Sequence, residues 1–386
     1  MRRRTFIIFF SIVLSLYALI NYYLFKSGWN AIPQSHSFKL LYLIIFLVLA
    51  VSYIAGRFLE RAALSWFSSL LVWIGSFWLA GMVYLFFFSL IFDILRAVNY
   101  ILPFYPTFIT NDYQYAKEII LIVVLSAVVL IVAGGYINSV IPRVHTLDIS
   151  IPKKCYLKSL NIAAASDIHL GTLICKSRME RIIKKINGLK PDIVLLPGDV
   201  VDEDLRPVIK QNLGETLRKI ESNFGVYAIT GNHEYIGGAE PACEYLEEHG
   251  IRMIRDSYIT IDKSIYIIGR EDRSIKAFTG KLRKPLEEII AGIDKSNPLI
   301  LMDHQPIKLD EAVSNGIDLQ LSGHTHHGQL WPFNFITKKV YELSRGYKVK
   351  GNTQFYVSCG VGTWGPPIRT GHRPEIVNIR LSFNHT

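Results

Sequence analysis

The sequence predicts an α/β domain preceded by an all-α region of four membrane-spanning helices. Residues 1–142 contain 9 Lys or Arg and 4 Asp or Glu, so about 9% of this segment is charged. The rest of the 386-residue chain is about 25% charged, which is ordinary for a soluble domain, and its short apolar β-type runs alternate with helical periodicity. The mean hydropathy of +0.26 excludes a disordered chain. We therefore predict a membrane region at 1–142 and a second domain at 143–386.

Four apolar runs in the first region are long enough to cross a bilayer core, which takes about 20 residues of helix. These runs cover residues 5–25, 40–59, 66–92 and 119–137. With the N-terminus in the cytoplasm, the inner segments and loops hold six Lys or Arg and the outer loops hold four. This bias favours a multi-pass protein of the inner (cytoplasmic) membrane whose second domain faces the cytoplasm.

Charge and cysteine content agree with that location. The net charge of +10 divides evenly between the two regions, which suggests contact with an anionic inner leaflet rather than a nucleic-acid partner. The four cysteines all lie beyond residue 142 and form no close pair, as expected for a reducing compartment. The membrane bilayer is thus the first expected partner, while the sequence leaves the oligomeric state open.

The elements of the second domain follow from apolar periodicity. A helix is predicted over 176–187, because Met179, Ile182, Ile183 and Ile186 share one helix face, and a second helix over 240–249. The remaining apolar runs are predicted strands at 160–165, 192–196, 225–229, 251–254, 259–261, 265–268, 299–302, 319–321, 354–357 and 376–381.

Five of these strands are each followed by Asp, Asn or His, at the strand ends where open sheets gather ligand-binding groups. The residues are Asp167, His169, Asp199, Asn232, His233, His304, His324 and His326. Hard oxygens mixed with imidazoles suit Mn, Fe or Zn. The set is too large for one four-coordinate ion but suits two divalent metal ions that share a bridging carboxylate, an arrangement used for in-line displacement at phosphorus. A Gly-Asn turn or a lone His by itself usually has a structural role. The complete set of these residues, in this order after five strands, instead indicates a functional site.

This ordered set resembles the calcineurin-like metallophosphoesterase family, and in particular its membrane-associated bacterial members. The matching motifs are Asp167-Ile168-His169, Gly198-Asp199 with Asp202, Gly231-Asn232-His233-Glu234, His304 and Gly323-His324-Thr325-His326, followed by a tail from Gly360 to Arg369. The resemblance covers residues 160–381. It implies a sandwich of two mixed β-sheets flanked by helices. Two departures are His327, where Gly is usual, and a membrane region longer than the common single anchor.

The resemblance also implies a role for each residue. Residues that would hold the first metal ion are Asp167, His169 and His326. Residues that would hold the second are Asn232, His304 and His324. Asp199 would bridge the two ions. His233 would not be a ligand but a catalytic residue that serves the leaving oxygen, a role that suits an imidazole.

These features predict a membrane-anchored hydrolase, a phosphodiesterase or pyrophosphatase in which a metal-bound hydroxide attacks the phosphorus. An aromatic run at 330–335 before Lys338 and Lys339 could enter an anionic interface, or it could cover the sheet. Arg369, His372 and Arg373 could bind a non-reacting phosphate or form surface salt bridges. Some similar enzymes cleave a nucleotide-linked diacylated sugar, so a lipid-linked nucleotide is the leading substrate hypothesis, ahead of a general phosphodiester.

An alternative from another class is a catalytically inactive membrane sensor or a transporter-associated metal-binding domain. Such a protein would be expected to lack a ligand or the catalytic His, and the sequence retains all of them. The predicted spans also hold almost no ionisable residue at mid-membrane depth, where a transport pathway would usually have one.

Overall fold

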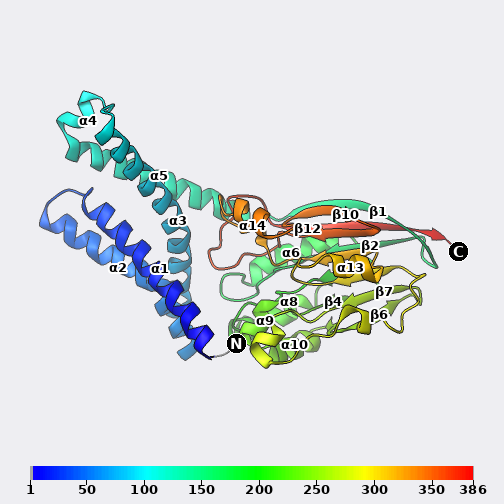
Figure 1. Cartoon of the computed structure of the whole chain (residues 1–386). Helices are drawn as coiled ribbons and strands as arrows, with labels where there is room; N and C mark the ends of the chain where they lie inside the picture. Colours follow the sequence, from blue (N-terminus) through cyan, green and yellow to red (C-terminus); the bar gives the residue numbers. More distant parts are fainter. Residues whose placement is uncertain (1–2, 386) are drawn as a thin grey trace. The chain divides into compact units, whose positions relative to one another are not determined.

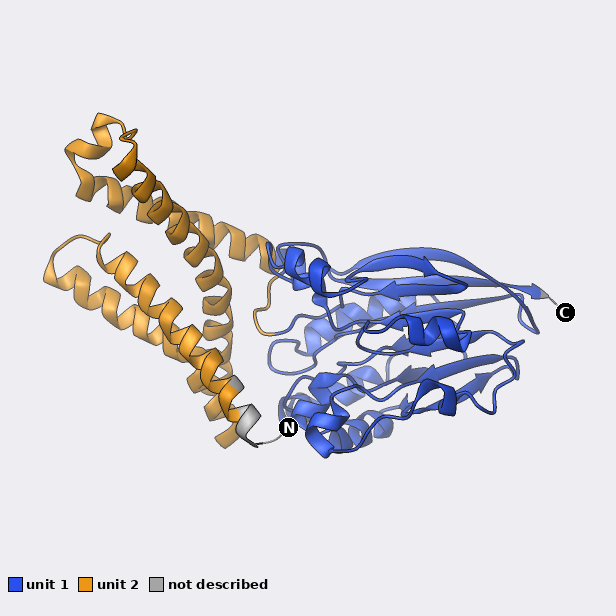
Figure 2. Ribbon diagram, in the orientation of Figure 1, with its two compact units in different colours: residues 1, 137–364, 369–386 blue, residues 2–136, 365–368 orange. Residues whose placement is uncertain are grey.

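The computed structural model describes residues 3–385, apart from the side chains of residues 3–6, 9 and 385. The chain divides into two compact units (Figure 2). One unit comprises residues 2–136 with the short segment 365–368, and the other comprises residues 137–364 and 369–386. Arg2, which the orientation argument counts, lies outside the described residues.

The first unit is helical (Figure 1). Its elements are α1 (Arg3–Trp29), α2 (His36–Ala62), α3 (Trp66–Ile101), the short α4 (Thr107–Asn111) and α5 (Tyr113–Ser139). Among the described residues, four of these helices are long and apolar enough to cross a membrane. Each of these four helices contains one of the apolar runs that the sequence predicted to cross the membrane. The third helix continues nine residues past its predicted end, because the first charge there, Asp93, is satisfied by Arg96 at 3.0 Å and by the hydroxyl of Tyr23 at 2.6 Å.

Helices α2 and α3 pack closely through small residues. A Cβ atom on Gly56 would come within 2.7 Å of the backbone nitrogen of Val72, and a Cβ atom on Gly75 would come still closer to the backbone of Tyr53. Such glycines let helices approach in membranes, where apolar burial drives association weakly. Beside this contact, the rings of Phe46 and Trp78 meet edge to face with centroids 5.2 Å apart.

The second unit contains two six-stranded mixed sheets. The first has the order β1-β12-β2-β3-β4-β5 and the second β10-β11-β9-β8-β7-β6. The strands of the first sheet are β1 (Arg143–Cys155), β12 (Glu375–His385), β2 (Ser159–Ala164), β3 (Ile193–Leu196), β4 (Val226–Ala228) and β5 (Ile251–Met253). Those of the second are β10 (Gly346–Lys350), β11 (Thr353–Val357), β9 (Leu319–Ser322), β8 (Leu299–Met302), β7 (Ile265–Gly269) and β6 (Ser257–Ile261). β2 to β5 run parallel, as do β7, β8, β9 and β11.

Alternate residues of the central strands enter different apolar layers, as the period of two requires. In β3, Ile193 and Leu195 face the core between the sheets, whereas Val194 and Leu196 face the outer helices. Helices that cover the first sheet are α6 (Lys176–Gly188), α8 (Leu213–Leu217) and α10 (Ala239–Glu248). Helices that cover the second are α12 (Leu286–Ile289) and α13 (Asp310–Asn315). Short helices complete the unit: α7 (Arg206–Lys210), α9 (Asn232–Gly237), α11 (Ile275–Thr279), the 3-10 turn η1 (His326–Gly328) and α14 (Asn334–Val340).

The predicted fold is confirmed: two mixed sheets lie between layers of helices, after four apolar helices. Each strand and helix predicted for the second domain is present, with ends that differ from the prediction by at most four residues. The sequence analysis did not locate β1, β10 or the short helices α4, α7, α8, α9, α11, α12, α13 and α14. The first four residues of β1 are all exposed, but Leu147, Ile149 and Ile151 alternate with Asp148 and Ser150, so its second half carried a strand pattern that the analysis overlooked.

Candidate metal centre

The candidate ligands lie at the carboxyl ends of strands in both sheets. Asp167 and His169 follow β2, Asp199 follows β3, and Asn232 begins α9 after β4. From the second sheet, His304 follows β8, and the pair His324 and His326 follows β9. Because parallel strands end at the same edge, these loops converge where the two sheets meet.

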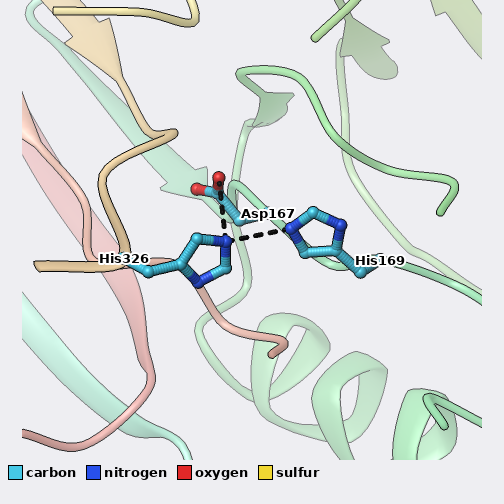
Figure 3. Close-up of side chains that lie close together, drawn as sticks. All are labelled: Asp167, His169 and His326. Carbon is cyan, nitrogen blue, oxygen red and sulfur yellow. Dashed lines mark hydrogen bonds and ion pairs between the residues drawn. The ribbon is translucent and has the colours of Figure 1, made fainter. Parts of the chain in front are cut away.

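A first cluster combines Asp167, His169 and His326, and one ligand atom of each lies within 4.8 Å of the others. The Nε2 atoms of His169 and His326 are 3.0 Å apart, and Nε2 of His326 lies 3.6 Å from Oδ1 of Asp167 (Figure 3). An ion with bonds of about 2.0–2.2 Å holds neighbouring donor atoms roughly 3–3.5 Å apart. These spacings therefore fit a metal ion.

A second cluster combines Asp199, His304 and His324 within the same 4.8 Å limit. Nε2 of His304 lies 3.1 Å from Oδ2 of Asp199. The amide oxygen of Asn232 lies 2.7 Å from Nδ1 of His324, so the amide belongs to this cluster too. All four residues that the sequence grouped together are thus neighbours.

Asp199 stands between the two clusters. The Oδ2 atom that faces His304 at 3.1 Å also lies 3.9 Å from Nε2 of His169, a member of the first cluster. Asp199 is 1% exposed. One carboxylate therefore reaches both groups of donors.

The backbone at these positions is strained. Asp167, His169, Asp199, His324 and His326 all have φ between 43° and 69°, a left-handed conformation that is uncommon for residues other than glycine. Such residues gather at functional sites, where the surrounding fold holds them in place. Gly231 contributes to the fit, because a Cβ atom there would lie 2.5 Å from the backbone nitrogen of Asp199.

The buried groups of the two clusters shift one another's pKa values. Burial opposes protonation of His304, but Asp199 outweighs burial and raises the pKa of His304 well above its usual range. Burial opposes ionisation of Asp199, but His304 and His233 outweigh it and hold the pKa of Asp199 well below its usual range. Burial lowers the pKa of His324, and burial with His169 lowers that of His326 well below its usual range. Both imidazoles are consequently neutral, which is the form that binds a metal.

Buried ligand atoms that lack a hydrogen bond indicate whether the two clusters suit a metal ion. Among the residues that the structure describes, Oδ2 of Asp167 is buried and makes no hydrogen bond. Nε2 of His304 is also buried without a hydrogen bond, although it faces Oδ2 of Asp199 at 3.1 Å. Buried polar atoms normally have a partner, and leaving one without costs free energy. These atoms point to the need for a cation, and a carboxylate with imidazole suits Mn, Fe or Zn.

His233 lies beside the clusters, held from two sides. Its Nδ1 atom lies 3.0 Å from Oδ1 of Asp202, and its backbone N–H donates to Oδ1 of Asp199 at 2.9 Å. Burial would lower the pKa of His233, but Asp199 and Asp202 outweigh burial and raise it to about 9. The indole of Trp364 packs edge to face on the imidazole at 5.8 Å.

Glu234 fixes the loops around His233. Its carboxylate accepts hydrogen bonds from the backbone N–H groups of Asp199, Val201 and Gly231 at 3.1, 2.9 and 2.7 Å. Burial, followed by the charge of Asp199, raises the pKa of Glu234 to about 7. This carboxylate thereby ties the end of β3 to the start of α9.

Two residues have roles that the sequence analysis missed. It quoted Asp202 as part of a motif without a role; its spacing of three from Asp199 was the available signal. It considered Arg369 as a phosphate ligand, but this side chain is fully buried. Its guanidinium donates to the carbonyl groups of Cys359, Gly360 and Gly362 and lies 3.1 Å from Nδ1 of His326, so it is not available to a substrate phosphate.

Comparisons with known proteins bear on these observations. A family model for calcineurin-like phosphoesterases matches residues 160–328, which include every candidate ligand. An uncharacterized metallophosphoesterase of Campylobacter jejuni is 30% identical over 385 residues, covering 97% of this chain and 98% of that protein. A transmembrane protein with a metallophosphoesterase domain from Danio rerio is 31% identical over 283 residues, or 69% of this chain and 63% of that protein.

A solved structure is similar only in part. The NAD nucleotidase of Haemophilus influenzae aligns with 53% of this chain and 45% of its own, at 18% identity and a TM-score of 0.36. The match to the Campylobacter protein covers nearly the whole chain, so it includes the apolar helices as well as the two sheets.

Proposed function

The chain belongs to the calcineurin-like metallophosphoesterase family, and we propose that it is a membrane-anchored hydrolase that cleaves a phosphodiester or pyrophosphate bond at a two-metal site. The observation that supports this most directly is the position of Asp199, whose Oδ2 faces His304 on one side and His169 on the other. A carboxylate shared between two sets of donors is what a pair of divalent ions requires.

The proposed ligand sets follow the two clusters. One ion would be held by Asp167, His169 and His326. The other would be held by Asn232, His304 and His324. Asp199 would bridge them. When bound, two Mn, Fe or Zn ions would polarise the phosphoryl group and supply a water activated at neutral pH.

The protein's own groups supply the remaining chemistry. His233 is placed to give a proton to the leaving oxygen, because Asp202 holds its Nδ1 and leaves Nε2 for the substrate. Burial opposes protonation of this imidazole, and the carboxylates of Asp199 and Asp202 favour it, which is the direction that a general acid needs. Glu234 holds the backbone on both sides of the site in place.

We place the reaction at the inner membrane, on its cytoplasmic side. The four apolar helices favour membrane attachment, and the distribution of Lys and Arg favours the cytoplasm for the second unit. Enzymes so anchored act efficiently on substrates in the same membrane, so a lipid-linked nucleotide is the preferred substrate class. The complete set of seven candidate ligands with His233 favours this enzyme over the inactive membrane sensor.

Hydrolysis by the detergent-purified chain tests the proposal. We expect cleavage of bis-p-nitrophenyl phosphate in the presence of Mn²⁺, loss of cleavage with chelator, and loss in Asp199→Ala. Asp204→Asn is the matched control, because Asp204 bonds Arg206 rather than the candidate ligands. If the purified protein binds no metal, the assignment of a two-metal site is wrong. If the protein cleaves p-nitrophenyl phosphate faster than the diester, the proposed substrate changes from a phosphodiester to a phosphomonoester.

A further inference from the structure

A basic cavity lies in the second unit, apart from the metal centre. Its volume is about 570 Å³, within the 300–1,000 Å³ that small-molecule sites usually have. Three arginines, Arg143, Arg345 and Arg373, line it together with Thr370 and one acidic residue, Glu375. They come from segments far apart in the sequence, at the start of β1, before β10 and before β12.

The positive charge of this cavity is only partly compensated. Arg345 lies 3.8 Å from Glu375, whose carboxylate also accepts the backbone N–H of Cys359. Among residues 3–385, neither Arg143 nor Arg373 has a carboxylate within ion-pair distance. Two guanidinium groups are therefore free to bind an anion, and their planar forks suit phosphate oxygens.

One wall of the cavity is the end of a candidate membrane helix. Asn138, in the last turn of α5, lines the cavity and donates from Nδ2 to the carbonyl groups of Arg369 and His372 at 2.8 and 3.0 Å. Helix α5 ends at Ser139, four residues before Arg143. Four residues span at most about 14 Å, so Arg143 lies close to where the chain leaves the apolar helix.

An apolar surface borders the cavity on another side. The backbone N–H of Trp331 donates to the hydroxyl of Thr370, a cavity residue, at 2.9 Å. Trp331 and three apolar side chains of α14 (Phe335, Ile336 and Val340) are each more than half exposed. Within the aromatic run 330–335, Leu330 is buried and Phe333 is half-buried, whereas Trp331 and Phe335 are exposed. Exposed apolar patches of this kind mark membrane or partner contacts.

We propose that the cavity binds the phosphate of an anionic phospholipid, with the acyl chains directed along the exposed side chains of Trp331 and α14. The arginines would bind the phosphate. The exposed apolar surface beside them favours a lipid over a soluble anion, because it can contact acyl chains. Lys338 and Lys339 on α14 add attraction to an anionic leaflet. This proposal does not depend on hydrolysis at the metal centre.

Lipid titration of the purified full-length chain, followed by native mass spectrometry, tests this site. The ligands are phosphatidylglycerol and phosphatidylcholine with identical acyl chains. The cavity variant is Arg143→Gln with Arg373→Gln. Its matched control is Arg218→Gln with Arg380→Gln, which removes the same charge from exposed positions outside the cavity. Unfolding curves establish that both variants fold.

We expect the wild type and the control to prefer phosphatidylglycerol, and the cavity variant to bind it at least about tenfold more weakly. Equal binding by the cavity and control variants would overturn the proposal. A second titration uses glycerol 1-phosphate, a soluble phosphate without acyl chains. If it binds the cavity as tightly as phosphatidylglycerol, the occupant is a soluble phosphate and the assignment to lipid is wrong.

Discussion

The carboxylate of Asp202 lies 3.0 Å from Nδ1 of His233. Because a carboxylate only accepts hydrogen bonds, Nδ1 must carry a hydrogen, which sets the orientation of the ring and leaves Nε2 as the atom that can reach a substrate. The two residues lie 31 positions apart, Asp202 on the loop after β3 and His233 in the first turn of α9. Their contact makes Asp202 a positioning residue for the proposed acid.

This contact predicts different effects for two substitutions. His233→Asn should lower kcat by about 10²–10⁴-fold, the usual contribution of a general acid, while the metal content stays unchanged. Asp202→Asn should lower kcat less and shift the alkaline limb of the pH–rate profile to lower pH, because it removes one of the charges that raise the pKa of His233. Initial rates over a pH series, with metal analysis of each variant, check both. A merely structural role for Asp202 would leave the position of that limb unmoved.

Metal binding should stabilise the second unit. A ligand at about 100 times its Kd adds about 2.7 kcal/mol, which for a domain of this size raises Tm by about 5–10 °C. Addition of Mn²⁺ to chelator-treated protein should produce this shift in a fluorescence-monitored melt. Asp199→Ala should show little of it, since that carboxylate is shared by both clusters. An equal shift in the variant would contradict the bridging assignment.

Arg369 should act on stability rather than on substrate affinity. Arg369→Met leaves several buried carbonyl groups without a donor and should cost about 3 kcal/mol, or roughly 6–12 °C in Tm. Arg369→Lys should not restore the loss, because an ammonium cannot reproduce the planar fork. Arg380→Met, at an exposed position, is the control for arginine removal. An unchanged Tm together with a raised KM would instead support a phosphate ligand.

Reporter fusions determine the side of the membrane. Alkaline phosphatase needs disulfides that form outside the cytoplasm, so we expect it to be inactive when fused after Thr386. Fused after Ala31, between α1 and α2, it should be active, which serves as the control. Activity at the C-terminal fusion would place the second unit outside the cytoplasm and overturn the proposed topology.

The sequence predicted the elements with the strongest patterns and missed weaker ones. β2, β3, β4, β8 and β9 were identifiable because each is an apolar run that ends in a ligand-type residue. β1 begins with four exposed residues, and the alternation of Leu147, Ile149 and Ile151 with polar residues in its second half was overlooked. β12 could not be assigned a neighbour. Sequence order gives no sign that β12 pairs with β1 and β2, since that pairing joins residues more than 200 positions apart.

For the candidate site, residue types and their order predicted which side chains are neighbours, but not how they are supported. The contacts of Glu234 are made to backbone N–H groups of three separate residues, and no pattern of side chains encodes such contacts. The burial of Arg369 was equally hidden, because an arginine near the C-terminus is by default expected on the surface. Both residues depend on long-range folding rather than on local sequence.

The place of β12 links the metal centre to the closure of the first sheet. This strand lies between β1 and β2, although it follows both by about 200 residues, and Arg369, just before it in the chain, contacts the imidazole of His326. During translation, α1 to α5 can already enter the bilayer while the sheet that bears Asp167 and Asp199 still has a gap. We therefore expect a chain that ends before β12 to insert its apolar helices but to bind metal poorly.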